Sequence, residues 1–99
     1  MSVKVAIHHK ADNVGVAIED IKKGDVVIGI YVSDMSPGPS VQALDDIPLG
    51  HKIALVDIKR GERVIKYGVP IGVATRDIKR GEHVHVHNLK SIRWSFARS

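Results

Sequence analysis

The chain has 99 residues, no cysteine and a formal net charge of +4 at pH 7. A chain of this length forms one domain around one core, and the lack of cysteine excludes both a disulfide framework and a thiolate metal site. Aromatic residues make up only 4% of the chain, and basic residues are interleaved with acidic ones, so nucleic-acid binding is unlikely. No segment has the pattern of a signal peptide or a membrane span, and we therefore expect a cytoplasmic protein without a membrane partner.

Valine and isoleucine supply most of the apolar residues, which favours strands over helices. Alternating apolar residues predict a first strand at residues 3–8, and an Asp-Asn pair predicts a turn by residue 13. Residues 26–32 predict a second strand. Residues 33–46 contain two prolines and a glycine, and we expect a loop there, either functional or a tolerated surface insertion.

Twelve residues recur without gaps at positions 16–27, 53–64 and 73–84, with the pattern apolar-Ala-x-x-Asp-Ile-Lys-basic-Gly-acidic-x-Val. Each copy predicts a strand, a tight turn and a strand, in which the glycine adopts a positive φ and the aspartate accepts hydrogen bonds from turn amides. The unequal intervals exclude a regular solenoid. We therefore expect a compact, mainly β domain over residues 1–92, in which one corner motif is reused, followed by a tail at 93–99.

The connections between the copies predict two further turns. Residues 47–52 indicate a different kind of turn, which leads into the second copy. Residues 64–72 predict a strand, a turn near Gly68 and a second strand.

Three histidines alternate with two valines at His83, His85 and His87, which predicts a strand with three imidazoles on one face. Residues two apart on a strand are ~6.6 Å apart, so His83 and His85 could share one metal ion. His83 and His87 would be about 13 Å apart, which excludes one ion on all three unless the strand breaks.

Two other interpretations of these imidazoles remain open. Because imidazole titrates near neutrality, the histidines could transfer protons or bind a carboxylate, with Lys52, Lys66 and Tyr67 holding the substrate. Alternatively, they form a polar solvent face whose opposite valines fill the core. No phosphate-binding loop or nucleophile motif is present in the sequence.

The repeats and the histidine segment together resemble the N-terminal SAF (β-clip) domain of altronate and galactarate dehydratases. The resemblance rests on four segments, at residues 50–55, 64–68, 71–78 and 81–88, and it extends from about His8 to Ser91. It implies a β-clip fold of bent hairpins. It also implies a sugar-acid dehydratase system that often requires a divalent metal such as iron or manganese, held mainly by a large catalytic subunit.

This resemblance leads to a hypothesis for function. We expect the small subunit of a sugar-acid dehydratase, a hydro-lyase, that completes or covers the active site of a separate large subunit and is inactive alone. The alternatives are the small subunit of a sulfolactate sulfo-lyase and a stand-alone module that binds sugar acids or other anions. The expected site residues are catalytic His85 and His87, metal-binding His83 and His85, and substrate-binding His51, Lys52, Lys66, Tyr67 and Asn88.

Overall fold

The computed structural model describes residues 2–91, so the predicted tail at 93–99 lies outside the described residues. The described chain consists of strands joined by turns and contains no helix. The strands are β1 Ser2–Ile7, β2 Val14–Ala17, β3 Val26–Tyr31, β4 Ser36–Gln42, β5 Lys52–Ala54, β6 Arg63–Lys66, β7 Val69–Ala74, β8 His83–Val84 and β9 Leu89–Ser91. This confirms the mainly β fold, and the architecture is consistent with a β-clip.

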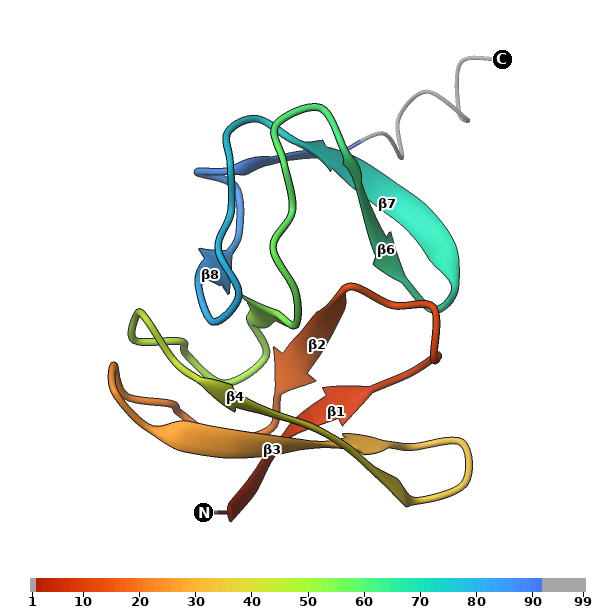
Figure 1. Ribbon diagram of the computed structural model, residues 1–99, viewed down its shortest axis with the longest axis vertical. Helices are drawn as coiled ribbons and strands as arrows, with labels where there is room; N and C mark the ends of the chain where they lie inside the picture. The colour runs from red at the N-terminus through yellow and green to blue at the C-terminus, as the bar shows by residue number, and fades with distance from the viewer. Residues whose placement is uncertain (1, 92–99) are drawn as a thin grey trace.

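The strands form two sheets; Figure 1 shows β1 to β4 of the larger sheet in the lower part and β6 and β7 of the smaller sheet in the upper part. The larger sheet has the order β4-β3-β1-β2-β5-β8, in which β1 and β3 are parallel and the other neighbours are antiparallel. The smaller sheet has the order β6-β7-β9 and is antiparallel throughout. Between β6 and β7, Tyr67 and Gly68 have φ values of 57° and 73°, which confirms the turn predicted near Gly68.

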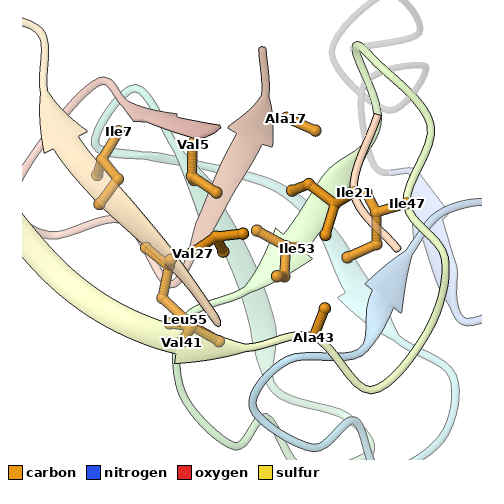
Figure 2. Packing of buried hydrophobic residues seen from close by; sticks show 10 residues of the cluster. All are labelled: Val5, Ile7, Ala17, Ile21, Val27, Val41, Ala43, Ile47, Ile53 and Leu55. Atoms are coloured by element: carbon orange, nitrogen blue, oxygen red, sulfur yellow. The ribbon is translucent and has the colours of Figure 1, made fainter. Parts of the chain in front are cut away.

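Two hydrophobic cores correspond to the two halves of the chain. Figure 2 shows the first core, which contains Val5, Ile7, Ala17, Ile21, Val27, Val41, Ala43, Ile47, Ile53 and Leu55. The second core contains Val14, Ala54, Ile58, Val64, Ala74, Ile78 and Val84. Their small, β-branched side chains suit the close approach of bent strands.

The loop expected at residues 33–46 is wrong for half of its length, because residues 36–42 form β4. This strand pairs with β3 from Val26↔Gln42 to Tyr31↔Ser36, and Val41 on it is 2% exposed. The two prolines misled the prediction because they lack an amide donor. They are tolerated because β4 lies at the edge of its sheet, where half of the backbone groups need no partner strand.

The corner motif occurs four times in the structure, not three. We call these segments corner 1 (residues 17–27), corner 2 (43–53), corner 3 (54–64) and corner 4 (74–84). Their turns contain Gly24, Gly50, Gly61 and Gly81, with φ values of 94°, 86°, 87° and 94°. Corner 2 was expected to be a different kind of turn. It keeps only the Ala-x-x-Asp-Ile-x-x-Gly skeleton of the motif, in residues 43–50.

The corners pack as two reciprocal pairs. In the first pair, the Lys23 amide donates to Asp46 Oδ1 (2.8 Å) and the Leu49 amide donates to Asp20 Oδ1 (2.9 Å). Corners 3 and 4 repeat this exchange: Arg60 N to Asp77 Oδ1 and Arg80 N to Asp57 Oδ1, both at 2.9 Å. Each aspartate therefore caps the turn of the partner corner and not its own turn, which corrects the expected role in detail.

Candidate functional site

The candidate site lies where the two halves of the chain meet. Strand β5 leaves corner 2 and strand β8 leaves corner 4, and the two strands pair antiparallel through Lys52↔Val84 and Ile53↔His83. Lys52 and His83 are equivalent positions of the corner motif, as are Ile53 and Val84. Each strand therefore contributes the same two motif positions to the pairing, which brings the turns of corners 2 and 4 close together.

The expected histidine strand ends early. Strand β8 stops at Val84, and residues 85–88 form a turn in which the Asn88 amide donates to the His85 carbonyl (3.1 Å). Val84 is fully buried, but Val86 is 81% exposed and does not face the core. The turn brings the His83 and His87 ring centroids to 5.2 Å, so the expected separation of about 13 Å is wrong.

Four imidazoles lie close together where β5 and β8 pair, and we call His51, His83, His85 and His87 the histidine cluster. His51 Nδ1 lies 2.8 Å from His83 Nε2, so one of these nitrogens carries the proton that the other accepts. The ring of His51 also stacks on that of His85, with centroids 4.1 Å apart. His51, His83 and His85 each offer a nitrogen, and these three nitrogens all lie within 4.8 Å of one another.

The sequence of corner 2 explains why a histidine is tolerated at position 51. In the other corners, the residue after the glycine is acidic and accepts the amide at the start of the turn: Asp25 from Lys22 N, Glu62 from Lys59 N and Glu82 from Lys79 N. In corner 2 the turn starts at Pro48, which has no amide hydrogen. No acidic cap is needed there, and the side chain of His51 turns to His83 instead.

Buried and acidic groups fix the backbone of the cluster. Asn88 is 1% exposed, and its amide donates to the His83 carbonyl (2.8 Å) and accepts from the His85 amide (3.0 Å). Asp45 Oδ2 accepts the His83 amide at 3.0 Å. Both ends of the Asn88 side chain are committed to the turn, and its expected role in substrate binding remains a prediction. It positions His83 and His85.

Of the remaining expected substrate-binding residues, Lys52 lies next to the cluster. It follows His51 and begins β5, and its positive charge acts on His85. Lys66 and Tyr67 belong to the β6–β7 turn, where the Lys66 ammonium lies 5.1 Å from the Tyr67 ring centroid. The ring of His8 packs against that of Tyr67, with the two ring centroids 4.1 Å apart.

Burial and mutual repulsion disfavour further positive charge at this site. Partial burial, followed by the positive charge of Lys66, lowers the pKa of Lys52. Burial also lowers the pKa of His83, with additional repulsion from His87, His51 and His85, while Asp45 acts in the opposite direction. For His85, burial again lowers the pKa, followed by the charges of His51 and Lys52. The neutral forms of the His83 and His85 imidazoles are therefore favoured near pH 7.

Sequence reasoning missed two contributors. His8 contacts the expected site residue Tyr67, and Asp45 holds the His83 backbone, although neither carries a motif of its own. His51 was expected to bind substrate but not to join the histidine segment 32 residues later. The signal that could have found it is the fourth corner, because alignment of residues 43–53 with 74–84 places His51 at the equivalent of Glu82, one position before His83.

This chain belongs to the family described as the altronate/galactarate dehydratase SAF domain, which matches residues 3–92. It is 48% identical over 83 residues to an altronate dehydratase of Bacillus subtilis (strain 168), covering 84% of this chain and 15% of that protein. It is 34% identical over 76 residues to a galactarate dehydratase (L-threo-forming) of Escherichia coli (strain K12), covering 77% of this chain and 13% of that protein.

A third relative has the same extent as this chain. The (2R)-sulfolactate sulfo-lyase subunit alpha of Chromohalobacter salexigens is 42% identical over 95 residues, covering 95% of this chain and 100% of that subunit. The relatives are therefore lyases or parts of lyases, and the chain spans about one seventh of the dehydratases that it matches. Within the described residues, no helix is long and apolar enough to cross a membrane.

Proposed function

We propose that this chain is the small subunit of a lyase, in which it completes or covers the active site of a separate large catalytic subunit. The preferred reaction is dehydration of a sugar acid of the altronate or galactarate type. The observation that carries the proposal is the histidine cluster, because four imidazoles and a lysine meet on a domain of this family. A cytoplasmic location remains a prediction.

The relatives support a role as one subunit among others. The sulfolactate sulfo-lyase relative, matched over its full length, is named as subunit alpha. The dehydratases contain the matching region as a small part of a longer protein. Both arrangements suit a domain that works beside a larger catalytic region, on the same chain or on another one.

The chemistry of dehydration fits the side chains of the expected site. Removal of a proton α to a carboxylate needs a base, and departure of the β-hydroxyl needs an acid. His85 and His87 are the proposed proton-transfer groups, since neutral imidazole accepts a proton and imidazolium donates one. Lys52 and Lys66 are proposed to attract the substrate carboxylate, and Tyr67 is proposed to bind a hydroxyl.

A divalent metal, iron or manganese, is part of the proposed enzyme, with the large subunit as the expected main holder. Bound there, the cation would supply Lewis acidity toward the substrate carboxylate. In this chain the fitting ligands are His51, His83 and His85, whose nitrogens lie within 4.8 Å of one another. An all-imidazole set suits iron better than manganese, because manganese prefers oxygen ligands.

Sulfolactate is the second candidate substrate, on the strength of the full-length match to a sulfo-lyase subunit. A sulfo-lyase would use the same base and carboxylate-binding groups, but the leaving group would be sulfite and not hydroxide. A stand-alone module that binds sugar acids is the third candidate, because a fold by itself does not fix function.

Reconstitution with a large-subunit homologue from the same genome tests the proposal. The pair is assayed with altronate, galactarate and sulfolactate, and 2-oxo acid formation and sulfite release are measured separately. Replacement of both His85 and His87 by alanine should lower turnover at least about 100-fold, within the range that general acid–base groups contribute. Unchanged turnover with the complex intact would overturn the assignment, and tight sugar-acid binding by the chain alone would favour the module.

A further inference from the structure

Three imidazole nitrogens in the histidine cluster are spaced almost as a metal ion requires. Tetrahedral coordination at metal–nitrogen distances of about 2.0–2.1 Å places the ligand nitrogens about 3.3 Å apart. The His51–His83 nitrogen pair, at 2.8 Å, needs to open by about 0.5 Å, and no pair in the group is wider than 4.8 Å. Metal binding therefore requires rotation of the side chains and a change of tautomer that frees both nitrogens of the His51–His83 pair.

The backbones that carry these ligands are held in place from both sides. The His51 amide donates to the Pro48 carbonyl (3.0 Å), and the His51 carbonyl accepts from the Ala17 amide (2.8 Å). The buried Asn88 side chain bridges His83 and His85, and Asp45 fixes the His83 amide. Most of the ordering cost is therefore met by folding, before any ligand binds.

The triad is not fully enclosed, because His51, His83 and His85 are each only partly buried. His85 and His87 lie in a turn whose apex residue Val86 is 81% exposed, and the His87 ring stands beside His83. Three protein ligands with an open fourth position are the arrangement of catalytic metal sites, whereas structural sites use four.

We propose that His51, His83 and His85 form a transition-metal site held by this chain alone, with an open position toward solvent or a bound partner. The all-nitrogen ligand set selects Zn²⁺, Co²⁺, Ni²⁺ or Fe²⁺ over Mg²⁺, Ca²⁺ and Mn²⁺, which prefer oxygen. The site changes the expected division of labour, because the small chain contributes ligands and not only a cover. It stands independently of the proposed function, since metal binding can be measured without any substrate.

Titration of the full 99-residue chain with Co²⁺ tests the site. The d–d absorption of Co²⁺ reports the coordination geometry, and calorimetry with Zn²⁺ reports stoichiometry and affinity. We expect one ion per chain and an intense visible band typical of four coordination. The variants His51→Gln, His83→Gln and His85→Gln should each weaken binding at least about tenfold, on the scale by which even supporting residues change metal affinity.

His9→Gln is the matched control, because His9 lies outside the cluster and its Nδ1 already accepts the Ala11 amide at 2.9 Å. This variant should bind Co²⁺ as the parent chain does. Circular dichroism and thermal unfolding establish that each variant is folded. If His51→Gln binds Co²⁺ as tightly as His9→Gln, or if Mn²⁺ binds as tightly as Co²⁺, the all-imidazole site is overturned. Loss of lyase turnover in the reconstituted pair without loss of Co²⁺ binding would instead concern the proposed function.

Discussion

His51 Nδ1 and His83 Nε2 lie 2.8 Å apart, although 32 residues separate them in the chain. The contact exists because both residues stand at the exit of a corner turn and because β5 and β8 pair reciprocally. Corner 4 keeps its acidic cap in Glu82, whereas the turn of corner 2 begins at a proline, which has no amide hydrogen to cap. One proline therefore frees position 51 from the capping role that it has in the other corners.

The link between Pro48 and His51 predicts a coupling between two substitutions. His51→Glu alone should not stabilise the protein, because no amide is present at position 48. The double variant Pro48→Lys/His51→Glu restores the Lys-x-Gly-Glu turn of corners 3 and 4 and should form the missing hydrogen bond. We expect a favourable coupling energy of about 0.5–1.5 kcal/mol, which is the usual net value of such a bond.

Urea unfolding of the parent, both single variants and the double variant measures this coupling as a double-mutant cycle. Glu62→Ala serves as a reference for the value of an existing cap, since Glu62 Oε1 accepts the Lys59 amide at 2.6 Å. If the two substitutions are additive, the proposed reason for a histidine at position 51 is wrong.

Two glycines with the same backbone angle should differ in their tolerance of alanine. Gly24 and Gly81 both have φ of 94°, so alanine at either site costs about 1–2 kcal/mol for a left-handed residue. A Cβ at position 24 meets no atom within 4 Å, but a Cβ at position 81 would lie 2.1 Å from the Gln42 carbonyl oxygen. Gly81→Ala should therefore lose a further 1–3 kcal/mol, roughly, from overpacking against β4.

The measurement is the free energy of unfolding of the two alanine variants in urea. Equal losses would contradict the packing of corner 4 against the strand that precedes corner 2. Because Gly24→Ala carries the same backbone strain, it isolates the steric part of the effect.

The sequence was sufficient to predict three of the four corners, because their information is local. An invariant glycine spacing and a flanking Asp-Ile pair determine a turn within about ten residues. The pairing of the corners could not be predicted in this way. It depends on exchanges between residues more than 15 positions apart, such as Lys23 with Asp46 and Arg80 with Asp57.

The histidine segment shows where periodicity misleads. Alternating His and Val predicts a strand, yet Asn88 captures the His85 amide and the His83 carbonyl and bends the chain after Val84. Asparagine favours turns through this kind of local bond. The bend brings His87 back to His83 and leaves Val86 outside. Asn88 was expected to bind substrate. Its burial could not be predicted, because burial depends on tertiary contacts that the sequence pattern does not reveal.

Replacement of Asn88 by alanine should damage both the fold and the metal site. The His83 carbonyl and the His85 amide would lose their partner in a buried setting, which costs about 1–3 kcal/mol for each group left unsatisfied. The ligands His83 and His85 would then be less well positioned, and Co²⁺ affinity should fall about 10–100-fold, as for other supporting residues of metal sites.

Asn13→Ala is the matched control for this prediction. The Asn13 side chain likewise bridges two backbone groups, donating to the Arg63 carbonyl (2.9 Å) and accepting the Ile65 amide (2.7 Å), but neither partner belongs to the histidine cluster. Thermal unfolding and Co²⁺ titration are measured for both variants. Asn13→Ala should lose stability and keep its Co²⁺ affinity. An equal loss of affinity in both variants would show that the effect is general destabilisation and not positioning.

The metal-free protein should lose stability as the pH falls below neutrality. The pKa of His83 is lowered below the ordinary value of 6.5 by burial and by the neighbouring His87, His51 and His85, against the opposing charge of Asp45. The unfolded chain therefore binds more protons than the folded chain, and stability rises with pH through this range. The stabilising contribution is complete above about pH 7.5 and is lost as the pH falls through 6.5 toward the lowered value.

Thermal unfolding from pH 5 to pH 8 in the presence of a chelator should give a shallower pH dependence for His83→Gln than for the parent chain or His9→Gln. Parallel profiles for all three proteins would contradict a partly buried, mutually repelling histidine cluster.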